Sequence, residues 1–440
     1  MTLSRRGLLG APAFLQREAF SIGVFEADVT PPIGSPVFTG YARKVVDPLV
    51  ARGIVLRGSQ KPVVVVSVDW CEIRNDSYDL WRGELAKAAG TDRERVLVSC
   101  VHQHDAPYTD SHAQLLLEKH GCPDKLCDPE FERRMIARVC GTLAGAKPGR
   151  VTHYGTGEAR VREVASNRRY VLPGGRVSFG RTSATRDPAI SAMPEGLIDP
   201  WLKTLSFWDG STPLAALSCY STHPMSYYGQ ADVSWDFVGM ARSRIRGQGL
   251  SIYCSGASGD TMAGKYNDGN PANRPVLAER ISQAMNEAWQ ATRRHPMRKA
   301  AFRCAKLRFE PRRTRGFLPE EMQQAVADQT ASRRKRFNAA LGKSWLRRLE
   351  QARPIDMPCL DLEGACVLLL PAEAFVQYQL WAQEMRKGGF VLTLGYGECA
   401  PGYIPTNREV NEGYDDDYCW VDMASAEERM RSAMNEALNG

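Results

Sequence analysis

Residues 96–107 read VLVSCVHQHDAP, an apolar run that ends in two histidines one residue apart. Alternate side chains of a strand point to the same face, so His102 and His104 can converge where the strand opens into a loop. Zinc-type ions bind neutral imidazoles together with a carboxylate or thiolate, and they commonly keep one position open for water. The pattern predicts a metal site at this strand end; a hydrogen-bonded structural pair is the alternative.

Similar apolar runs recur along the chain and predict an α/β fold. The run VVVVSVD at residues 63–69 is typical of a strand buried on both faces, and residues 78–89 have helical spacing. A third apolar run, residues 214–220, leads directly to His223. Strands that alternate with helices and end in polar residues favour sheets with helices on their faces.

Composition and charge limit the class of protein. The chain has 440 residues, of which 43% are hydrophobic and 24% charged, as in an ordinary soluble enzyme. Its net charge of +7 is mild, and much of it lies at residues 333–348. No nucleic-acid-binding motif occurs, and no apolar run has the length of a transmembrane helix. We therefore expect no nucleic-acid partner and at most peripheral membrane contact.

The basic segment falls within residues 320–352, a polar stretch with strong helical character. We interpret this stretch as a helical insertion or lid. Its charges are expected to form a solvated helix face, and the alternative is contact with an anionic lipid or polyanion.

The first residues have features of an export signal. Arg5 and Arg6 precede a short apolar stretch, as in a twin-arginine signal, without a clean A-x-A cleavage site. We expect residues 1–19 to be a leader, residues 20–440 to be a single domain, and the protein to be periplasmic or secreted. The alternative is an unstructured leader on a cytoplasmic protein.

Twelve cysteines are many for an exported enzyme unless some are paired. His120, Cys122 and Cys127 can form a structural metal site, or the two cysteines can form a local disulfide or stay unpaired. Others lie in apolar runs, where a cysteine acts as a small hydrophobe: Cys100, Cys219, Cys254 and Cys366.

Several short motifs occur in an order that resembles the catalytic domain of the neutral/alkaline (non-lysosomal) ceramidases. They are DVTPP at 28–32, GYA at 40–42, DPL at 47–49, HxH at 102–104, His223, LPAEAF at 370–375, GYIPT at 402–406 and EGY at 412–414. The resemblance extends from about residue 20 to the C-terminus. It implies a layered sandwich of β-sheets flanked by α-helices, and we expect no immunoglobulin-like domain after it.

The resemblance implies a zinc-dependent amidohydrolase. By motif, four residues hold Zn²⁺: His102, His223, Glu373 and Tyr403. His104 would handle the catalytic proton, Tyr403 would also stabilise the oxyanion, and Asp260 in the glycine-rich loop is counted with them as catalytic. Two imidazoles and a carboxylate leave zinc positive enough to activate water at neutral pH. For Tyr403 the alternative is a buried structural tyrosine.

Two departures from the ceramidase motifs concern the substrate. The family's glycine loop continues Gly-Asp-Val-Ser-Pro-Asn with an essential serine, whereas Met262 occupies that place here, and neither Thr261 nor Ser258 replaces it directly. Residues 105–107 read DAP instead of Ser-Gly-Pro. We therefore expect cleavage of an amide in a small N-acyl compound, such as an acylated amino sugar or amino lipid, rather than in ceramide.

Two other functions remain open from the sequence. The first is a zinc esterase or lactonase on the same site, because activated water attacks esters more easily than amides. The second is an exported binding protein that keeps the fold and the metal without turnover.

Overall fold

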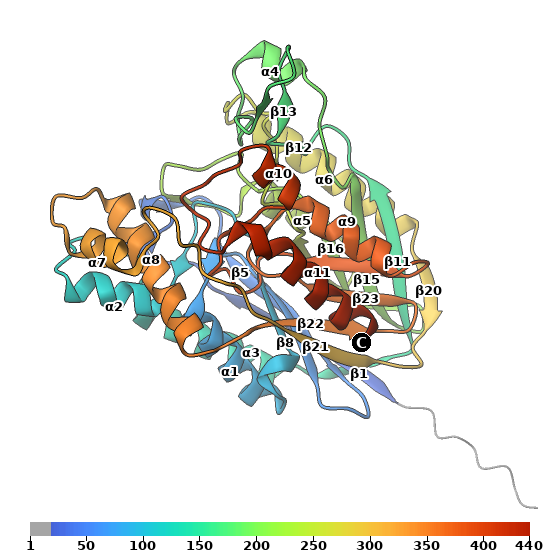
Figure 1. The fold of residues 1–440 in the computed structure, drawn as a ribbon. Coiled ribbons are helices and arrows are strands. Elements are labelled where there is room, and N and C mark those ends of the chain that lie inside the picture. Colours follow the sequence, from blue (N-terminus) through green and yellow to red (C-terminus); the bar gives the residue numbers. More distant parts are fainter. Residues whose placement is uncertain (1–18) are drawn as a thin grey trace, which may run out of the picture.

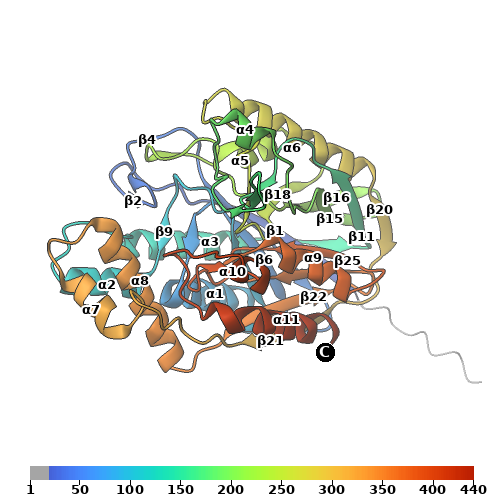
Figure 2. The ribbon, with the colours of Figure 1, turned by 45° about the horizontal axis from the view of Figure 1, so that its top comes forward.

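Three β-sheets enclose one shared apolar core in the computed structural model, which describes residues 19–440 (Figure 1). The predicted export leader falls almost entirely on residues 1–18, outside the described residues. Side chains from all three sheets meet in the core, among them Leu97, Leu217 and Val367. Helices lie on the outer faces of the sheets, so the predicted layered arrangement of sheets flanked by α-helices is confirmed (Figure 2).

Each sheet combines antiparallel neighbours with one parallel pair. The first sheet has the order β10 (Pro148–Val151), β1 (Phe20–Asp28), β5 (Val50–Arg57), β6 (Val63–Val68) and β8 (Val96–Cys100). The second has the order β18 (Leu250–Ser255), β16 (Thr212–Tyr220), β15 (Trp201–Asp209), β11 (His153–Arg160) and β20 (Arg293–Pro296). The third has the order β21 (Ala301–Leu307), β22 (Ile355–Asp361), β23 (Ala365–Leu369) and β25 (Phe390–Leu394).

Two helices cover the outer face of each sheet. They are α1 (Asn75–Ala89) and α3 (Pro129–Ala144) on the first, α5 (Asp236–Arg244) and α6 (Asn273–Gln290) on the second, and α9 (Val376–Met385) and α11 (Met423–Asn439) on the third. The other helices lie in the connections: α2 (Ser111–Lys119), α4 (Pro188–Ala192), α7 (Pro319–Ala327), α8 (Arg333–Glu350) and α10 (Asn407–Asn411). No helix within residues 19–440 is long and apolar enough to cross a membrane.

Short two-stranded pairs lie in the loops between these elements. They are β2 (Pro36–Val37) with β3 (Gly40–Tyr41), β4 (Lys44–Val45) with β17 (Asp232–Val233), β7 (Glu72–Ile73) with β9 (Tyr108–Thr109), β12 (Ser166–Asn167) with β19 (Thr261–Met262), β13 (Tyr170–Val171) with β14 (Val177–Ser178), and β24 (Glu373–Ala374) with β26 (Tyr403–Ile404).

The valine run in β6 shows why the sheets have two buried faces. Val63 and Val65 point into the core between the sheets, whereas Val64 and Val66 point outward to the cluster under α1 and α3. A β-branched side chain packs well on a pleated surface, and the alternation of side chains supplies both faces with valine. The prediction of a strand buried on both faces is confirmed.

Three parallel strand pairs bring their carboxyl ends to one region of the molecule. The pairs are β6 with β8, β16 with β18, and β23 with β25, one in each sheet. The loops after β8, β16 and β23 carry His102, His223 and Glu373, whose side chains lie together. Ligand sites in sheets with parallel strands form in this position because the loops that leave the carboxyl ends can approach one another.

The structure divides the predicted helical stretch at 320–352 into two helices, α7 and α8. Between them Asp328 accepts a hydrogen bond from the backbone of Thr330, and the Ser332 hydroxyl accepts one from the backbone of Lys335 at the start of α8. These side chains satisfy backbone donors that helix ends leave unpaired, so the chain turns between the two helices.

All twelve cysteines are free. Cys122 and Cys127 form no disulfide, and within residues 19–440 they belong to no cluster suited to a metal ion. The His120 ring contacts the Gln323 amide at 3.1 Å instead. Of the three alternatives for this segment, the structure shows unpaired thiols.

We predict that stability falls as pH rises because Glu132 of α3 is buried. Burial raises the pKa of its carboxyl to about 7 from 4.5. The folded chain then holds a proton that the unfolded chain releases between these values, so the free energy of unfolding falls with pH by up to about 1.4 kcal/mol per pH unit. In Glu132→Gln, the free energy of unfolding, measured by denaturant titration, should depend less on pH between about 5 and 7.

The exposed Glu130 on the same helix provides the control, since Glu130→Gln should leave the pH dependence unchanged. If the free energy of unfolding changed with pH equally in Glu132→Gln and in the unaltered protein, the prediction would be wrong.

Candidate metal centre

His102 lies in a strained loop immediately after β8. The strand ends at Cys100, and His102 has φ 71°, in the left-handed region that side chains with a Cβ seldom adopt. The two histidines therefore lie beyond the strand, and the alternation of strand side chains, on which the sequence argument relied, is not what brings His102 and His104 together. The loop brings their rings together instead, 5.1 Å apart and nearly perpendicular.

Backbone carbonyls orient the two histidines that face Glu373. Nδ1 of His102 lies 3.0 Å from the carbonyl oxygen of Cys71, and Nδ1 of His223 lies 2.6 Å from that of Ser258. A carbonyl only accepts hydrogen bonds, so each Nδ1 carries the proton and each Nε2 presents a lone pair. These Nε2 atoms face one oxygen of Glu373, at 3.4 Å for His102 and 2.9 Å for His223.

This donor set fits a divalent cation. Two nitrogen lone pairs and a carboxylate oxygen, all on buried side chains, face one another, and a positive charge between them would stabilise the arrangement. Nε2 of His102 has no hydrogen-bond partner among residues 19–440. Burial alone would raise the pKa of Glu373, but the charge and hydrogen bonds that His102 and His223 offer when protonated outweigh it and hold the pKa well below its usual range. A metal ion at the same place would supply that positive charge to the neutral rings. Metal-binding histidines commonly donate their second ring N–H to a backbone carbonyl, as Nδ1 of His102 and Nδ1 of His223 do here.

A second group, Cys71, His102 and His104, also lies within ligand distance. Burial and the nearby carboxylates of Glu72 and Glu373 raise the pKa of the Cys71 thiol well above its usual range. Because the thiolate is the form that binds metal, the set of His102, His223 and Glu373 is the better ligand group.

Tyr403 is held beside Glu373 by backbone pairing. Strands β24 and β26 are parallel, and Glu373 and Tyr403 are register partners. Burial, together with the negative charge of Glu373, raises the pKa of Tyr403 well above its usual range. The phenol therefore keeps its proton and can hydrogen-bond to the Glu373 carboxylate.

His104 lies on the wall of the site, with Phe38 4.8 Å and Tyr228 5.6 Å from its ring. Its Nε2 has no hydrogen-bond partner among the described residues. Burial and the neighbouring rings of His102 and His223 lower its pKa well below its usual value. The ring is therefore neutral at pH 7 and has a free nitrogen.

Asp260 lies behind the ligands. One carboxylate oxygen accepts a hydrogen bond of 2.7 Å from the backbone of Val376 at the start of α9, and the other accepts one of 2.6 Å from Asn167. Burial raises its pKa to about 7. These contacts anchor the segment that follows Glu373, so Asp260 acts on the site through the backbone and does not face the pocket.

Three residues that the sequence reasoning missed also shape the centre. The Tyr396 ring stacks on His102 at 4.1 Å, and Glu72, which is bound to Arg74, lies 3.8 Å from Nδ1 of His102. Arg168 lies over the Tyr403 ring at 5.2 Å, with its Nε and Nη1 atoms buried and unbonded among residues 19–440. Glu72 and Tyr396 follow apolar strands, as His102 does, and that pattern could have identified them.

A cavity of about 460 Å³ opens onto this centre, a size suited to a small molecule. The site residues on its wall are His102, His104, Glu373, Tyr403, Arg168 and Glu72. His223 lies beneath them, fully buried. The cavity therefore gives a small molecule access to His104 and to the Glu373 carboxylate.

Comparison with known proteins bears on the fold. No protein-family model and no curated protein matches the sequence. Among solved structures, neutral ceramidase from Pseudomonas aeruginosa has a TM-score of 0.67 and 17% identity, covering 96% of this chain and 74% of that chain. A structure described as ceramidase complexed with C2 has a TM-score of 0.68 and 16% identity, covering 96% and 75%. The chain therefore has the fold of the neutral ceramidases, as the order of its motifs predicted.

Proposed function

We propose that this protein is a zinc-dependent hydrolase that cleaves the amide bond of an N-acyl compound other than ceramide. One observation carries the proposal: a buried group of His102, His223 and Glu373 forms the base of a pocket whose wall presents the free nitrogen of His104. The ceramidase fold supports the reaction class.

His102, His223 and Glu373 would hold the zinc ion, with the Tyr403 hydroxyl beside Glu373 as a further ligand. When bound, zinc supplies Lewis acidity, which polarises a carbonyl group and makes water more acidic. The backbone carbonyls of Cys71 and Ser258 keep both imidazoles in the tautomer that this role needs.

His104 would transfer the proton. In amide hydrolysis the water oxygen bonds to the acyl carbon, the carbon–nitrogen bond breaks, and the amine leaves with a proton. A neutral imidazole with an unbonded Nε2 can take a proton from water and return it to the leaving nitrogen. The aromatic contacts of His104 with Phe38 and Tyr228 hold the ring in place for this task.

Arg168 and Tyr403 would stabilise the negative charge that forms on the carbonyl oxygen. Arg168 presents buried guanidinium nitrogens that have no partner among residues 19–440, and its charge lies over the Tyr403 ring. Donors that are fixed in a dry site before the reaction stabilise an oxyanion strongly. The same arrangement would act on an ester, so a screen of substrates must contain both bond types.

The first prediction concerns the metal. His102→Ala and His223→Ala should each lose stoichiometric zinc, because one imidazole, the Glu373 carboxylate and a protonated phenol hold the ion poorly. Elemental analysis of the purified variants measures this loss. His295→Ala is the control, since His295 is exposed and outside the site. Full zinc content in either site variant would show that the ligand set is wrong.

The second prediction separates His104 from the ligands. His104→Ala should keep its zinc while its turnover of an N-acyl substrate falls by about 100-fold or more, the usual effect of losing a general acid or base. Zinc content and kcat are measured on one preparation. Loss of metal as complete as in His102→Ala would instead make His104 a ligand.

The third prediction concerns ceramide, which should be hydrolysed weakly or not at all. Ser258 contacts the Tyr396 hydroxyl at 2.7 Å, and Thr261 donates to the carbonyl of Ser221 at 3.3 Å. Neither hydroxyl is therefore free to take the place of the family's serine, and the buried Met262 does not line the pocket. A chromatographic assay should detect cleavage of a short N-acyl amine under conditions in which ceramide stays intact.

The same assay, repeated with a short-chain ester and with a chelator, tests the reaction class. Esters cleaved to the exclusion of amides would replace the amidase proposal with an esterase, and bound zinc without any turnover would favour a binding protein. Efficient cleavage of ceramide would overturn the substrate argument.

A further inference from the structure

Helix α8 forms one wall of the metal-centre pocket, and its polarity changes along that wall. Arg333, Phe337 and Leu341 are spaced by four residues, lie on one helix face, and all line the pocket. Leu341 is buried, Phe337 and Arg333 are both half-buried, and the adjoining Arg334 is exposed. The wall therefore changes from apolar in its depth to cationic at its mouth.

Aromatic rings hold Arg333 in place, and no acid among residues 19–440 forms an ion pair with it. Its guanidinium lies 4.9 Å from the Phe337 ring and 5.7 Å from the Tyr41 ring. Its Nε atom is buried without a hydrogen-bond partner among residues 19–440. Stacking on aromatic rings orients an arginine while leaving its donors available for a planar anion.

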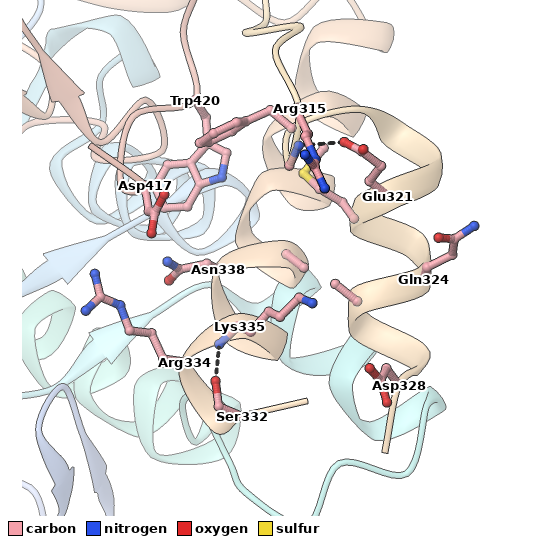
Figure 3. Close-up of a pocket in the computed structure, with 15 residues that line it drawn as sticks. Arg315, Glu321, Gln324, Asp328, Ser332, Arg334, Lys335, Asn338, Asp417 and Trp420 are labelled. Atoms are coloured by element: carbon pink, nitrogen blue, oxygen red, sulfur yellow. Dashed lines mark hydrogen bonds between the residues drawn. The ribbon is translucent and has the colours of Figure 1, made fainter. Parts of the chain in front are cut away.

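Arg334 adds a second cation at the same mouth. It is exposed and lines the pocket, and its side chain has no ion pair or hydrogen bond with any of residues 19–440. Figure 3 shows Arg334 and Lys335 leaving α8 in opposite directions, with Lys335 directed toward α7. Lys335 lines only the neighbouring groove between the two helices.

Other arginines of α8 have acceptors. Arg336 donates to the carbonyl of Val326, Arg347 to Asp76, and Arg348 to Asp79. The free donors of α8 arginines are thus concentrated at the two that line the pocket.

The acidic groups on the pocket wall do not neutralise these cations. Glu72 is paired with Arg74, Glu373 faces the two histidines, and Asp416 lies 4.0 Å from Arg168. Asp417, on the adjoining groove, forms no ion pair with any of residues 19–440. Arg334 also lines that groove, so Asp417 is an acidic group that can compete for it, but no ion pair joins the two within residues 19–440. The donors of Arg333 and Arg334 therefore stay available to attract an anion.

The hairpin formed by β2 and β3 contacts α8, and its contacts indicate which end of the substrate meets this charge. Phe38 contacts His104 and belongs to the turn between β2 and β3, and Tyr41 of β3 contacts Arg333. The hairpin thus connects the His104 side of the pocket to the cationic mouth. Because His104 would protonate the leaving amine, the amine part of the substrate lies on this side.

We infer that the substrate of the proposed hydrolase is an N-acyl amine whose amine part carries a carboxylate or a phosphate, and that Arg333 and Arg334 bind this anion. The inference rests on the proposed function for the position of the amide. Arginine suits both anions because its planar donors bind two oxygens at once. Ceramide has no such group, which agrees with the proposal of a different substrate.

Two matched pairs of substrates test the inference on zinc-loaded protein. N-octanoylglycine is compared with the neutral N-octanoylglycinamide, and N-octanoyl-O-phosphoethanolamine with the neutral N-octanoylethanolamine. The charged member should have a kcat/KM at least about tenfold higher in one pair or in both. The pair with the larger ratio identifies the anion, and a ratio near one in both pairs overturns the inference.

Variants locate the anion site. In the double variant Arg333→Gln/Arg334→Gln the preference for the charged member should disappear, whereas Lys335→Gln should keep it. Circular dichroism and zinc content establish that the double variant is folded and loaded. A preference that survives in the double variant would contradict the assignment of these two arginines.

Calorimetry gives a readout that does not depend on turnover. His104→Ala protein titrated with N-octanoylglycine should bind at least about tenfold more tightly than with N-octanoylglycinamide. If none of the four amides is cleaved, the hydrolase proposal fails, and calorimetry then decides the anion site by itself. Tighter binding of the charged member supports the site, and equal binding overturns it.

Discussion

The buried carboxylate of Glu373 faces the Nε2 atoms of His102 and His223, and the rest of the molecule is organised around this contact. Burying an ionised carboxylate is costly unless a positive charge lies beside it. Each ligand comes from a different sheet, so the three sheets must be held in fixed positions for the site to exist. A shared apolar core between the sheets meets that requirement.

Buried polar contacts and local strain complete the arrangement. Arg242 of α5 binds Asp69, at the end of β6, through two hydrogen bonds of 2.7 Å, which join the first and second sheets near the loops that carry the ligands. His102, Ala372 and Tyr396 all have positive φ, and each is at or next to the metal centre. Such conformations persist only where the surrounding structure enforces them, and they concentrate at functional sites.

Much of the fold and part of the site could be predicted from local patterns. The valines of β6 and the apolar runs before His102 and His223 predict buried strands with polar chemistry at their ends, since burial on both faces selects apolar residues at every position. The motif order predicted the ceramidase fold. Arg168 was missed because its role depends on a neighbour distant in the sequence, whereas Glu72 and Tyr396 follow apolar strands and that pattern could have identified them. Asp260 was counted as catalytic from the resemblance, and the structure places it behind the ligands, where it accepts a hydrogen bond from the backbone of Val376.

By itself the sequence determined the strands, the helical stretch before residue 352 and the residue types available as ligands, because hydrophobic period and side-chain chemistry are local properties. Only the tertiary structure decided which donors share one oxygen of Glu373, how the loop turns His102, and which arginines of α8 lack an acceptor. These depend on distances between segments far apart along the chain, and such distances follow from the packing of three sheets on one core.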